Sequence, residues 1–239
     1  MLDTAVPLPR RGRTYASRRR VRLSDRDARG RLRLDAVARY LQDVAIDDVQ
    51  ETGWGVPEHL WFVRRVQVDV VTPFLDDAEV ELTTWCSGVA ALAAGRRWSV
   101  AGDAGGRIEV DSVWIHLDAD GNPARIDRFG PYSEAGGDRR VSTRFELPVP
   151  ADGSRTSWPL RAADVDVHGH VNNTVYWQAV EELWPTLGVD PRAPLRAELD
   201  FRRPLDAGEA LELVTADADG AALVAFTVGS DVRAVARIS

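Results

Sequence analysis

The sequence predicts an α+β fold built from one structural unit that is used twice. The segment beginning at Arg22 reads R-L-S-D-R-D-A-R-G-R-L, and the segment beginning at Arg161 reads R-A-A-D-V-D-V-H-G-H-V. One Arg, two Asp and one Gly recur at a constant offset of 139 residues. Residues 66–84 and 197–215 match further along, sharing an Asp, a Pro and a Glu-Leu pair. Two matches in the same order indicate an internal repeat.

In the first repeat, a helix is expected directly after the first matched segment. Its apolar residues recur at helical spacing, and Gly53 is a stop signal after them. Alternating apolar residues then predict strands within residues 66–84 and over residues 97–102 and 108–117, the last two joined by a turn at 103–106. The apolar stripe of the helix comprises Leu34, Val37, Ala38, Leu41, Ala45 and Val49.

The second repeat follows the same order. Either Asn172 or Asn173 is the expected helix N-cap, and Pro185 and Gly188 end the helix. Strands are expected within residues 197–215 and over 221–228 and 232–238. The helical stripe comprises Val175, Ala179, Val180 and Leu183. Each unit is thus a strand, a long helix and an antiparallel meander, and pairing two units covers an exposed sheet edge.

These matches divide the chain into four segments. Residues 1–20 are expected to be an N-terminal tail running into an edge strand, 21–117 the first repeat, 118–155 a connector rich in Pro and Gly, and 156–239 the second repeat. The connector has no counterpart in the match between the repeats. We therefore expect it to link two similarly folded units.

Composition excludes several classes of protein. A net charge of −7 over 239 residues disfavours wrapping nucleic acid, which needs clustered positive charge. The single cysteine, Cys86, excludes an intrachain disulfide and fits a reducing, cytoplasmic compartment. No apolar run approaches the roughly 20 residues that span a bilayer, and the first 20 residues lack the apolar region of a secretory signal.

Residues 164–176 read D-V-D-V-H-G-H-V-N-N-T-V-Y, directly before the helix of the second repeat. Positions that both repeats share should carry the fold, so Asp164 and Gly169 are interpreted as structural. Positions that differ should carry the chemistry. The first repeat has Arg29, Arg31, Arg33 and Leu34 where the second has His168, His170, Asn172 and Asn173.

The residue types of this motif fit an acyl transfer to water. His170 can act as a base near neutral pH, while Asp166 can orient an imidazole or act as base or nucleophile itself. Backbone N–H groups at the helix start, from Asn172 to Thr174, can stabilise an oxyanion, and Asn172 or Asn173 can cap the helix or contact substrate. His168 is a further catalytic candidate or a solvated loop residue. A metal is not expected, because the two histidines lack a distal His or Cys partner.

The motif resembles the D-x-D-x-N-x-H-V-N-N-x-x-Y motif of the acyl-acyl carrier protein (ACP) thioesterases of plants and bacteria, and the resemblance extends loosely over residues 21–238. It implies a tandem (double) hotdog fold, in which two long central helices are wrapped by antiparallel β-sheet. It also implies that Asp166 and His170 are catalytic. The matching residues are Asp164, Asp166, His170, Val171, Asn172, Asn173 and Tyr176.

The sequence departs from the family at two places. His168 stands where the family has Asn. The plant enzymes carry a Glu-Cys pair after Arg-Arg, whereas Arg202-Arg203 is followed here by Pro204-Leu205. Glu182 matches an acidic position on the family's helix, and it either reaches the site or lies on a solvated helix face.

The expected function is therefore hydrolysis of fatty acyl-ACP without a cofactor, by a monomer (a pseudo-dimer) or a homodimer. An acyl-coenzyme A thioesterase and a non-catalytic acyl-binding or dehydratase-like hotdog protein are the alternatives. An acidic carrier would favour an arginine-rich surface. Candidates for that surface, which could equally be a solvated face, are Arg26, Arg29, Arg31 and Arg33.

Overall fold

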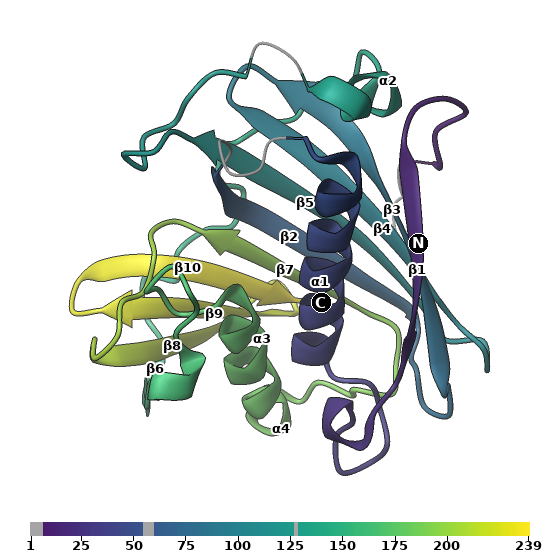
Figure 1. Cartoon of the computed structure of the whole chain (residues 1–239). Helices are drawn as coiled ribbons and strands as arrows, with labels where there is room; N and C mark the ends of the chain where they lie inside the picture. Colours follow the sequence, from purple (N-terminus) through teal and green to yellow (C-terminus); the bar gives the residue numbers. More distant parts are fainter. Residues whose placement is uncertain (1–6, 55–59, 127–128) are drawn as a thin grey trace.

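The computed structural model describes residues 7–54, 60–126 and 129–239, in which ten strands form one antiparallel sheet (Figure 1). The order is β1-β3-β4-β5-β2-β7-β10-β9-β8-β6. The first repeat supplies β1 (Thr14–Arg20), β2 (Leu60–Thr72), β3 (Glu79–Ala90), β4 (Ala93–Gly102) and β5 (Arg107–Leu117). The second supplies β6 (Ser154–Trp158), β7 (Leu195–Phe201), β8 (Leu211–Ala218), β9 (Ala221–Val228) and β10 (Asp231–Ile238).

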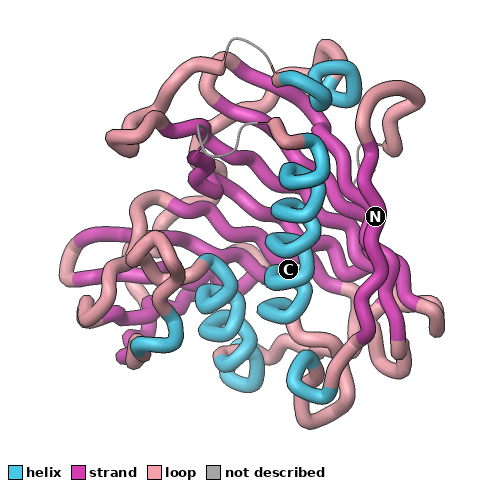
Figure 2. Tube along the Cα trace, in the orientation of Figure 1, coloured by secondary structure: helices cyan, strands magenta, loops and turns pink. Residues whose placement is uncertain are grey.

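The helices α1 (Leu34–Thr52) and α3 (Asn173–Glu182) lie on the same face of this sheet, one for each repeat (Figure 2). Gly53, at a φ of +62°, ends α1 in the left-handed conformation, as the sequence predicts. The second helix is shorter because Pro185 cannot continue its hydrogen bonding. A separate turn, α4 (Trp184–Leu187), starts there and ends at Gly188. The connector contributes the short helix α2 (Ser133–Gly136).

The strand order reads the same from either end once each strand is replaced by its counterpart in the other repeat, so the repeats are related by a pseudo-twofold axis between β2 and β7. The pairing there is reciprocal. Val66 faces Leu199, and Val68 faces Ala197. Leu199 is itself the repeat counterpart of Val68, as Ala197 is of Val66. This is the isologous contact of a symmetric dimer, and it confirms the tandem hotdog fold.

Two ion pairs repeat this symmetry across the β2–β7 seam. The Nε of Arg65 donates to Asp200 at 2.8 Å, and the Nε of Arg196 donates to Asp69 at 2.6 Å. Both carboxylates are buried. Removing either arginine would leave a buried carboxylate short of its partner, so these pairs fix the register in which the repeats join.

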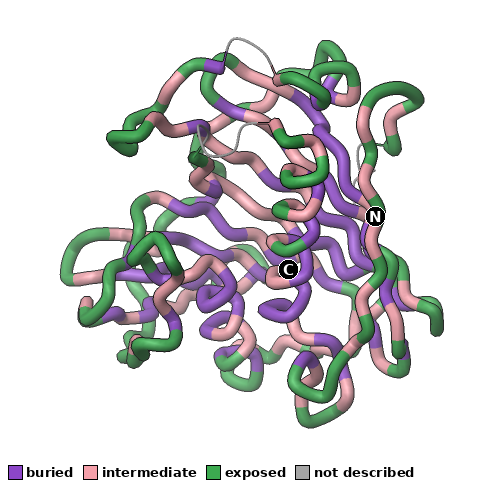
Figure 3. The backbone as a smooth tube through the Cα atoms, in the orientation of Figure 1, coloured by how far each residue is buried: buried purple, intermediate pink, exposed green. Residues whose placement is uncertain are grey.

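The main apolar core lies between the helices and the sheet, where buried residues of both meet (Figure 3). The connector covers the opposite face. Its Leu147 packs on Val214, Ala225 and Val235, whose neighbours along the strands belong to the main core. The backbone N–H groups of residues 146 and 147 also donate to Asp200. The connector is therefore packed against the sheet at the junction of the repeats.

β1 lies within residues 1–20 and pairs with β3, so it is the edge strand into which the expected tail runs. β6 begins at Ser154, within the segment assigned to the connector. Residues 1–6 of the expected tail and 127–128 of the connector lie outside the described residues. Among the helices of the described ranges, none is both long enough and apolar enough to span a bilayer.

Candidate functional site

The loops before α1 and α3 share one backbone geometry. In the second repeat, Gly169 N–H donates to the carbonyl of Asp166, and Asp166 N–H donates to the carbonyl of His170. The first repeat makes the same two bonds, with Gly30, Asp27 and Arg31 in those positions. The glycines have φ values of +83° and +84°, which an L side chain rarely adopts. The shared residues thus shape the loop, as the repeat comparison predicts.

Asp164 is structural. Its side chain is buried, and it accepts hydrogen bonds from the Arg161 backbone N–H at 2.8 Å and from the Arg161 guanidinium at 2.7 Å. Burial alone would raise the pKa of this carboxyl, but the hydrogen bonds and charge of Arg161 outweigh burial and lower it. The backbone carbonyl of Asp164 also accepts a hydrogen bond from Asn172 N–H at 2.8 Å, so Asp164 anchors the start of α3.

We expect Asp164→Asn to lower the free energy of unfolding at pH 7 and to matter less in acid. A carboxyl whose folded pKa is depressed stabilises the fold above its unfolded pKa of about 3.9, and loses that contribution as the pH falls through the folded value. Urea unfolding at pH 7 and pH 3 measures the difference. Asp152→Asn, at an exposed position, is the control. A deficit as large at pH 3 as at pH 7 would contradict this assignment.

His170 contacts an acidic residue that lies 36 positions away. Its Nδ1 is 2.7 Å from Oδ1 of Asp206, in the segment after β7, and both side chains are about half exposed. A carboxylate can only accept, so Nδ1 carries a proton, and in the neutral tautomer of the ring Nε2 presents its lone pair. The sequence motif did not identify Asp206. Its counterpart in the first repeat is Leu75, and that difference is the signal that could have found it.

Asp166 and His168 lie in the same loop as His170 but make different contacts. Oδ1 of Asp166 accepts the backbone N–H of His168 at 2.9 Å, as Asx turns do. The imidazole of His168 is exposed. Asp206, and not Asp166, is therefore the carboxylate that holds the His170 ring.

The start of α3 leaves one amide open. Asn172 is the N-cap, and its Oδ1 accepts Thr174 N–H at 3.0 Å. Asn172 N–H is itself bonded to Asp164. Within the described residues, the amide of Asn173 has no hydrogen-bond partner in the protein. It is therefore the N–H at this helix start that can receive an oxyanion.

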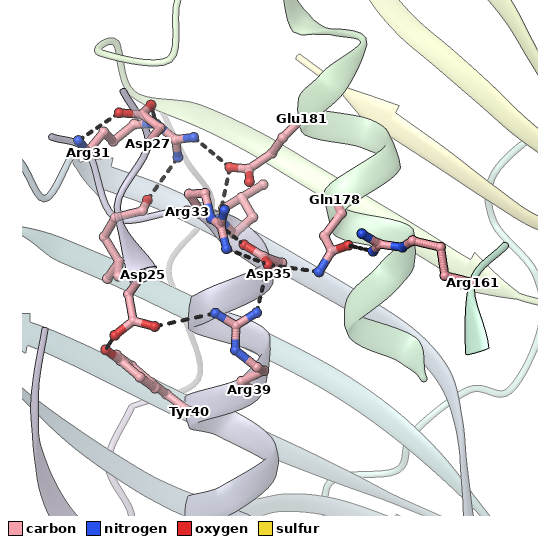
Figure 4. A network of polar contacts seen from close by, with 12 residues as sticks. Asp25, Asp27, Arg31, Arg33, Asp35, Arg39, Tyr40, Arg161, Gln178 and Glu181 are labelled. Carbon is pink, nitrogen blue, oxygen red and sulfur yellow. Dashed lines mark hydrogen bonds and ion pairs between the residues drawn. The ribbon is translucent and has the colours of Figure 1, made fainter. Parts of the chain in front are cut away.

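The first repeat shows what that position can hold. Glu181 of α3 places Oε1 at 2.8 Å from Leu34 N–H and 2.6 Å from Nη2 of Arg31 (Figure 4). Leu34 and Arg31 are the counterparts of Asn173 and His170. A carboxylate oxygen thus fills, in the first repeat, the position that is open in the second.

Gln42 of α1 is the counterpart of Glu181 at the same offset of 139 residues. Its Oε1 lies 3.5 Å from Nδ2 of Asn172, so α1 reaches the start of α3 just as α3 reaches the start of α1. Sequence reasoning singled out Glu182, which is exposed, and missed both Glu181 and Gln42. Only the antiparallel pairing of the helices brings these two residues to the helix starts.

Most of the arginines proposed as a carrier-binding surface are engaged within the protein. Arg31 is buried, so its assignment to a carrier surface or a solvated face was wrong. It pairs with Glu181 and lies over the ring of Trp184, 4.5 Å from its centroid. Arg26 donates to backbone carbonyls of Gly30 and Leu75. Arg33 pairs with Asp35, and Arg29 is exposed.

A groove of about 800 Å³ opens beside the Arg31–Glu181 pair. Trp158, Trp184 and Pro185 line it together with the arginine-bearing loop of the first repeat. None of the three catalytic candidates of the second repeat lines it. This groove therefore lies between the first-repeat loop and the second-repeat segments around α3 and α4, and not at the histidine motif.

Comparison with known proteins gives two family matches that together cover most of the chain. The acyl-ACP thioesterase N-terminal domain matches residues 12–127, and the acyl-ACP thioesterase C-terminal domain matches residues 149–231. An uncharacterized protein of Mycobacterium tuberculosis is 36% identical over 241 residues, covering 97% of this chain and 94% of that protein. The chloroplastic oleoyl-acyl carrier protein thioesterase 2 of Arabidopsis thaliana is 26% identical over 212 residues, covering 76% of this chain and 57% of the plant protein.

Solved structures resemble the whole chain. A 12:0-ACP thioesterase from Umbellularia californica has a TM-score of 0.76 at 17% identity, covering 95% of this chain and 96% of that one. An acyl-ACP thioesterase from Bacteroides thetaiotaomicron has a TM-score of 0.75 at 18% identity, with 94% and 96% covered. These two likenesses bear on the fold, while the two domain matches decide the family: the chain belongs to the acyl-ACP thioesterases.

Proposed function

We propose that the protein hydrolyses the thioester of fatty acyl-ACP and releases the free fatty acid. The observation that carries this proposal is the arrangement at the start of α3. His170 is paired with Asp206 through Nδ1, and the open amide of Asn173 occurs at the position where the first repeat binds a carboxylate oxygen. Family membership supports the choice of substrate.

His170 acts as the general base in this proposal. Its Nε2 takes a proton from water, and the resulting hydroxide attacks the carbonyl carbon of the thioester. Asn173 N–H donates to the oxyanion that forms, while Asp206 stabilises the imidazolium. Collapse of the tetrahedral intermediate breaks the carbon–sulfur bond. The proton held by His170 then passes to the leaving thiolate, so no cofactor is required.

The other motif residues have supporting roles in the proposal. Asp166 orients the water or the thioester, and His168 takes the place of the family's Asn as a hydrogen-bond donor to substrate or water. Asn172 and Thr174 fix the helix start through the cap that joins them. The β2–β7 seam within one chain reproduces a dimer contact, which favours a monomeric pseudo-dimer over a homodimer. We assign the reaction to the cytoplasm.

The test is a hydrolysis assay with the purified protein on acyl-ACP and acyl-coenzyme A of matched, increasing chain length. Released thiol and free fatty acid are measured together. We expect faster turnover on the carrier protein than on coenzyme A. Equal or faster turnover on coenzyme A would favour the coenzyme A thioesterase. Acyl-ACP binding without release of thiol would favour a non-catalytic acyl-binding protein.

A further inference from the structure

The pseudo-twofold axis gives the protein two helix starts, one closed and one open. At the closed one, Glu181 reaches across from α3 and its Oε1 accepts Leu34 N–H and an Arg31 N–H. At the open one, the residue that reaches across from α1 is Gln42. The two sites therefore differ by a carboxylate against an amide at the position that reaches across from the opposite helix.

We propose that Gln42, which belongs to the repeat without the motif, contacts the substrate and donates its Nε2–H to the thioester oxygen beside Asn173 N–H. This inference rests on the proposed function of the same site. It adds a second donor for the oxyanion, supplied by the opposite repeat. The active site would then be shared between the two halves of the chain.

The orientation of the Gln42 amide follows from the helix cap. Oδ1 of Asn172 is committed to Thr174 N–H at 3.0 Å, so Nδ2 is the end of that amide that faces Gln42. Nδ2 can only donate, and Gln42 must therefore offer it Oε1. That leaves Nε2 of Gln42, with its two N–H groups, directed away from Asn172. The helix cap thus fixes the side-chain amide of Asn172, which in turn orients the side-chain amide of Gln42.

The charge at this position decides what the site can do. A carboxylate on α1 would accept a hydrogen bond from the Asn173 N–H, as Glu181 accepts one from Leu34 N–H. It would then occupy the position of the thioester oxygen. Its negative charge would also repel the developing oxyanion. A neutral amide leaves the position open and donates to it.

The experiment uses Gln42→Glu and Gln42→Met in the full-length protein. We expect kcat on acyl-ACP to fall by roughly 10²–10³-fold in both variants, the loss typical of one oxyanion donor, with a smaller change in KM. Gln42→Glu should also raise the midpoint of thermal unfolding at pH 7, because the new carboxylate accepts the Asn173 amide at a helix N-terminus. Gln42→Met should not raise it, because methionine offers no such acceptor.

Glu181→Gln is the matched control at the first-repeat helix. It should lower the unfolding midpoint and leave kcat within about twofold, because Glu181 serves the closed helix start. Wild-type kcat in both Gln42 variants, together with an inactive His170→Ala, would overturn this inference and leave the proposed function standing. If the wild-type protein hydrolysed no thioester, the proposed function would fail. The placement of Gln42 would then be tested by thermal unfolding alone. An unchanged or lower unfolding midpoint in Gln42→Glu would overturn it.

Discussion

Replacing His170 by alanine is expected to lower turnover on acyl-ACP by about 10²–10⁴-fold, the usual contribution of a positioned general base. The fold should survive. The side chain is 49% exposed, and the first repeat builds the same loop with Arg31 at this position. Single-turnover kinetics of the folded variant, with circular dichroism as the check on folding, measure the effect.

The partner of His170 provides a second variant for the same prediction. Asp206→Asn keeps the shape of the side chain but weakens the hold on Nδ1, so turnover should fall, by less than in His170→Ala. The two losses should not add, because base and orienter act as one unit. Asp166→Ala should also reduce turnover, while Asp27→Ala at the first-repeat counterpart should not. Near-normal turnover in His170→Ala would place the active site elsewhere and strengthen the non-catalytic alternative.

Arg31→Ala is expected to lower the free energy of unfolding by about 3–5 kcal/mol at pH 7, the usual cost of removing one partner from a buried ion pair. The side chains of Arg31 and Glu181 are only 6% and 11% exposed. Burial already raises the pKa of the Glu181 carboxyl, and Arg31 opposes that rise. Without the guanidinium, the buried carboxylate would keep the hydrogen bond from Leu34 N–H but lose its cationic partner.

The loss of unfolding free energy in Arg31→Ala should be smaller in acid. Once the pH falls below the raised pKa of Glu181, the carboxyl is protonated and no uncompensated charge remains. Urea unfolding compares the free energy of unfolding of Arg31→Ala with that of Arg31→Ala/Glu181→Leu. The double variant should recover part of the lost stability, because it has no buried carboxylate without a cation. Arg29→Ala, at an exposed position, should stay within about 0.5 kcal/mol of wild type. A cost below about 1 kcal/mol for Arg31→Ala would contradict the ion-pair assignment.

The sequence predicted those parts of the fold that depend on neighbouring residues. Gly53 ends α1, one of the two asparagines expected as the cap of α3, Asn172, caps it, and the turn at residues 103–106 joins two strands of the meander. In each case one residue or a short run sets the backbone by its own chemistry. The constant offset between the repeats added the long-range part, because two copies of one unit must pair in a closed arrangement.

The motif contains only part of the candidate site, because two of its residues lie outside residues 164–176. His170 lies in the motif, but its partner Asp206 comes from the segment after β7, and Gln42, which we propose to contact the substrate, comes from the other repeat. Neither residue has a local pattern that marks it. Glu181 was passed over in favour of its neighbour Glu182, because helical spacing alone cannot tell which of two adjacent acids faces the other helix.

In the proposed mechanism, the pseudo-twofold arrangement of the repeats gives a reason for two unlike halves in one chain. A homodimer made from the second repeat alone would preserve the β7 edge, and it would carry the histidine motif twice. Each of its helices, however, would bring Glu181 to the other subunit's Asn173 amide, so both oxyanion positions would be filled by the protein's own acid. Joining the halves in one chain lets one helix carry glutamine where the other carries glutamate. In the proposed mechanism, one helix start is thereby left open for the thioester oxygen, while Glu181 closes the other.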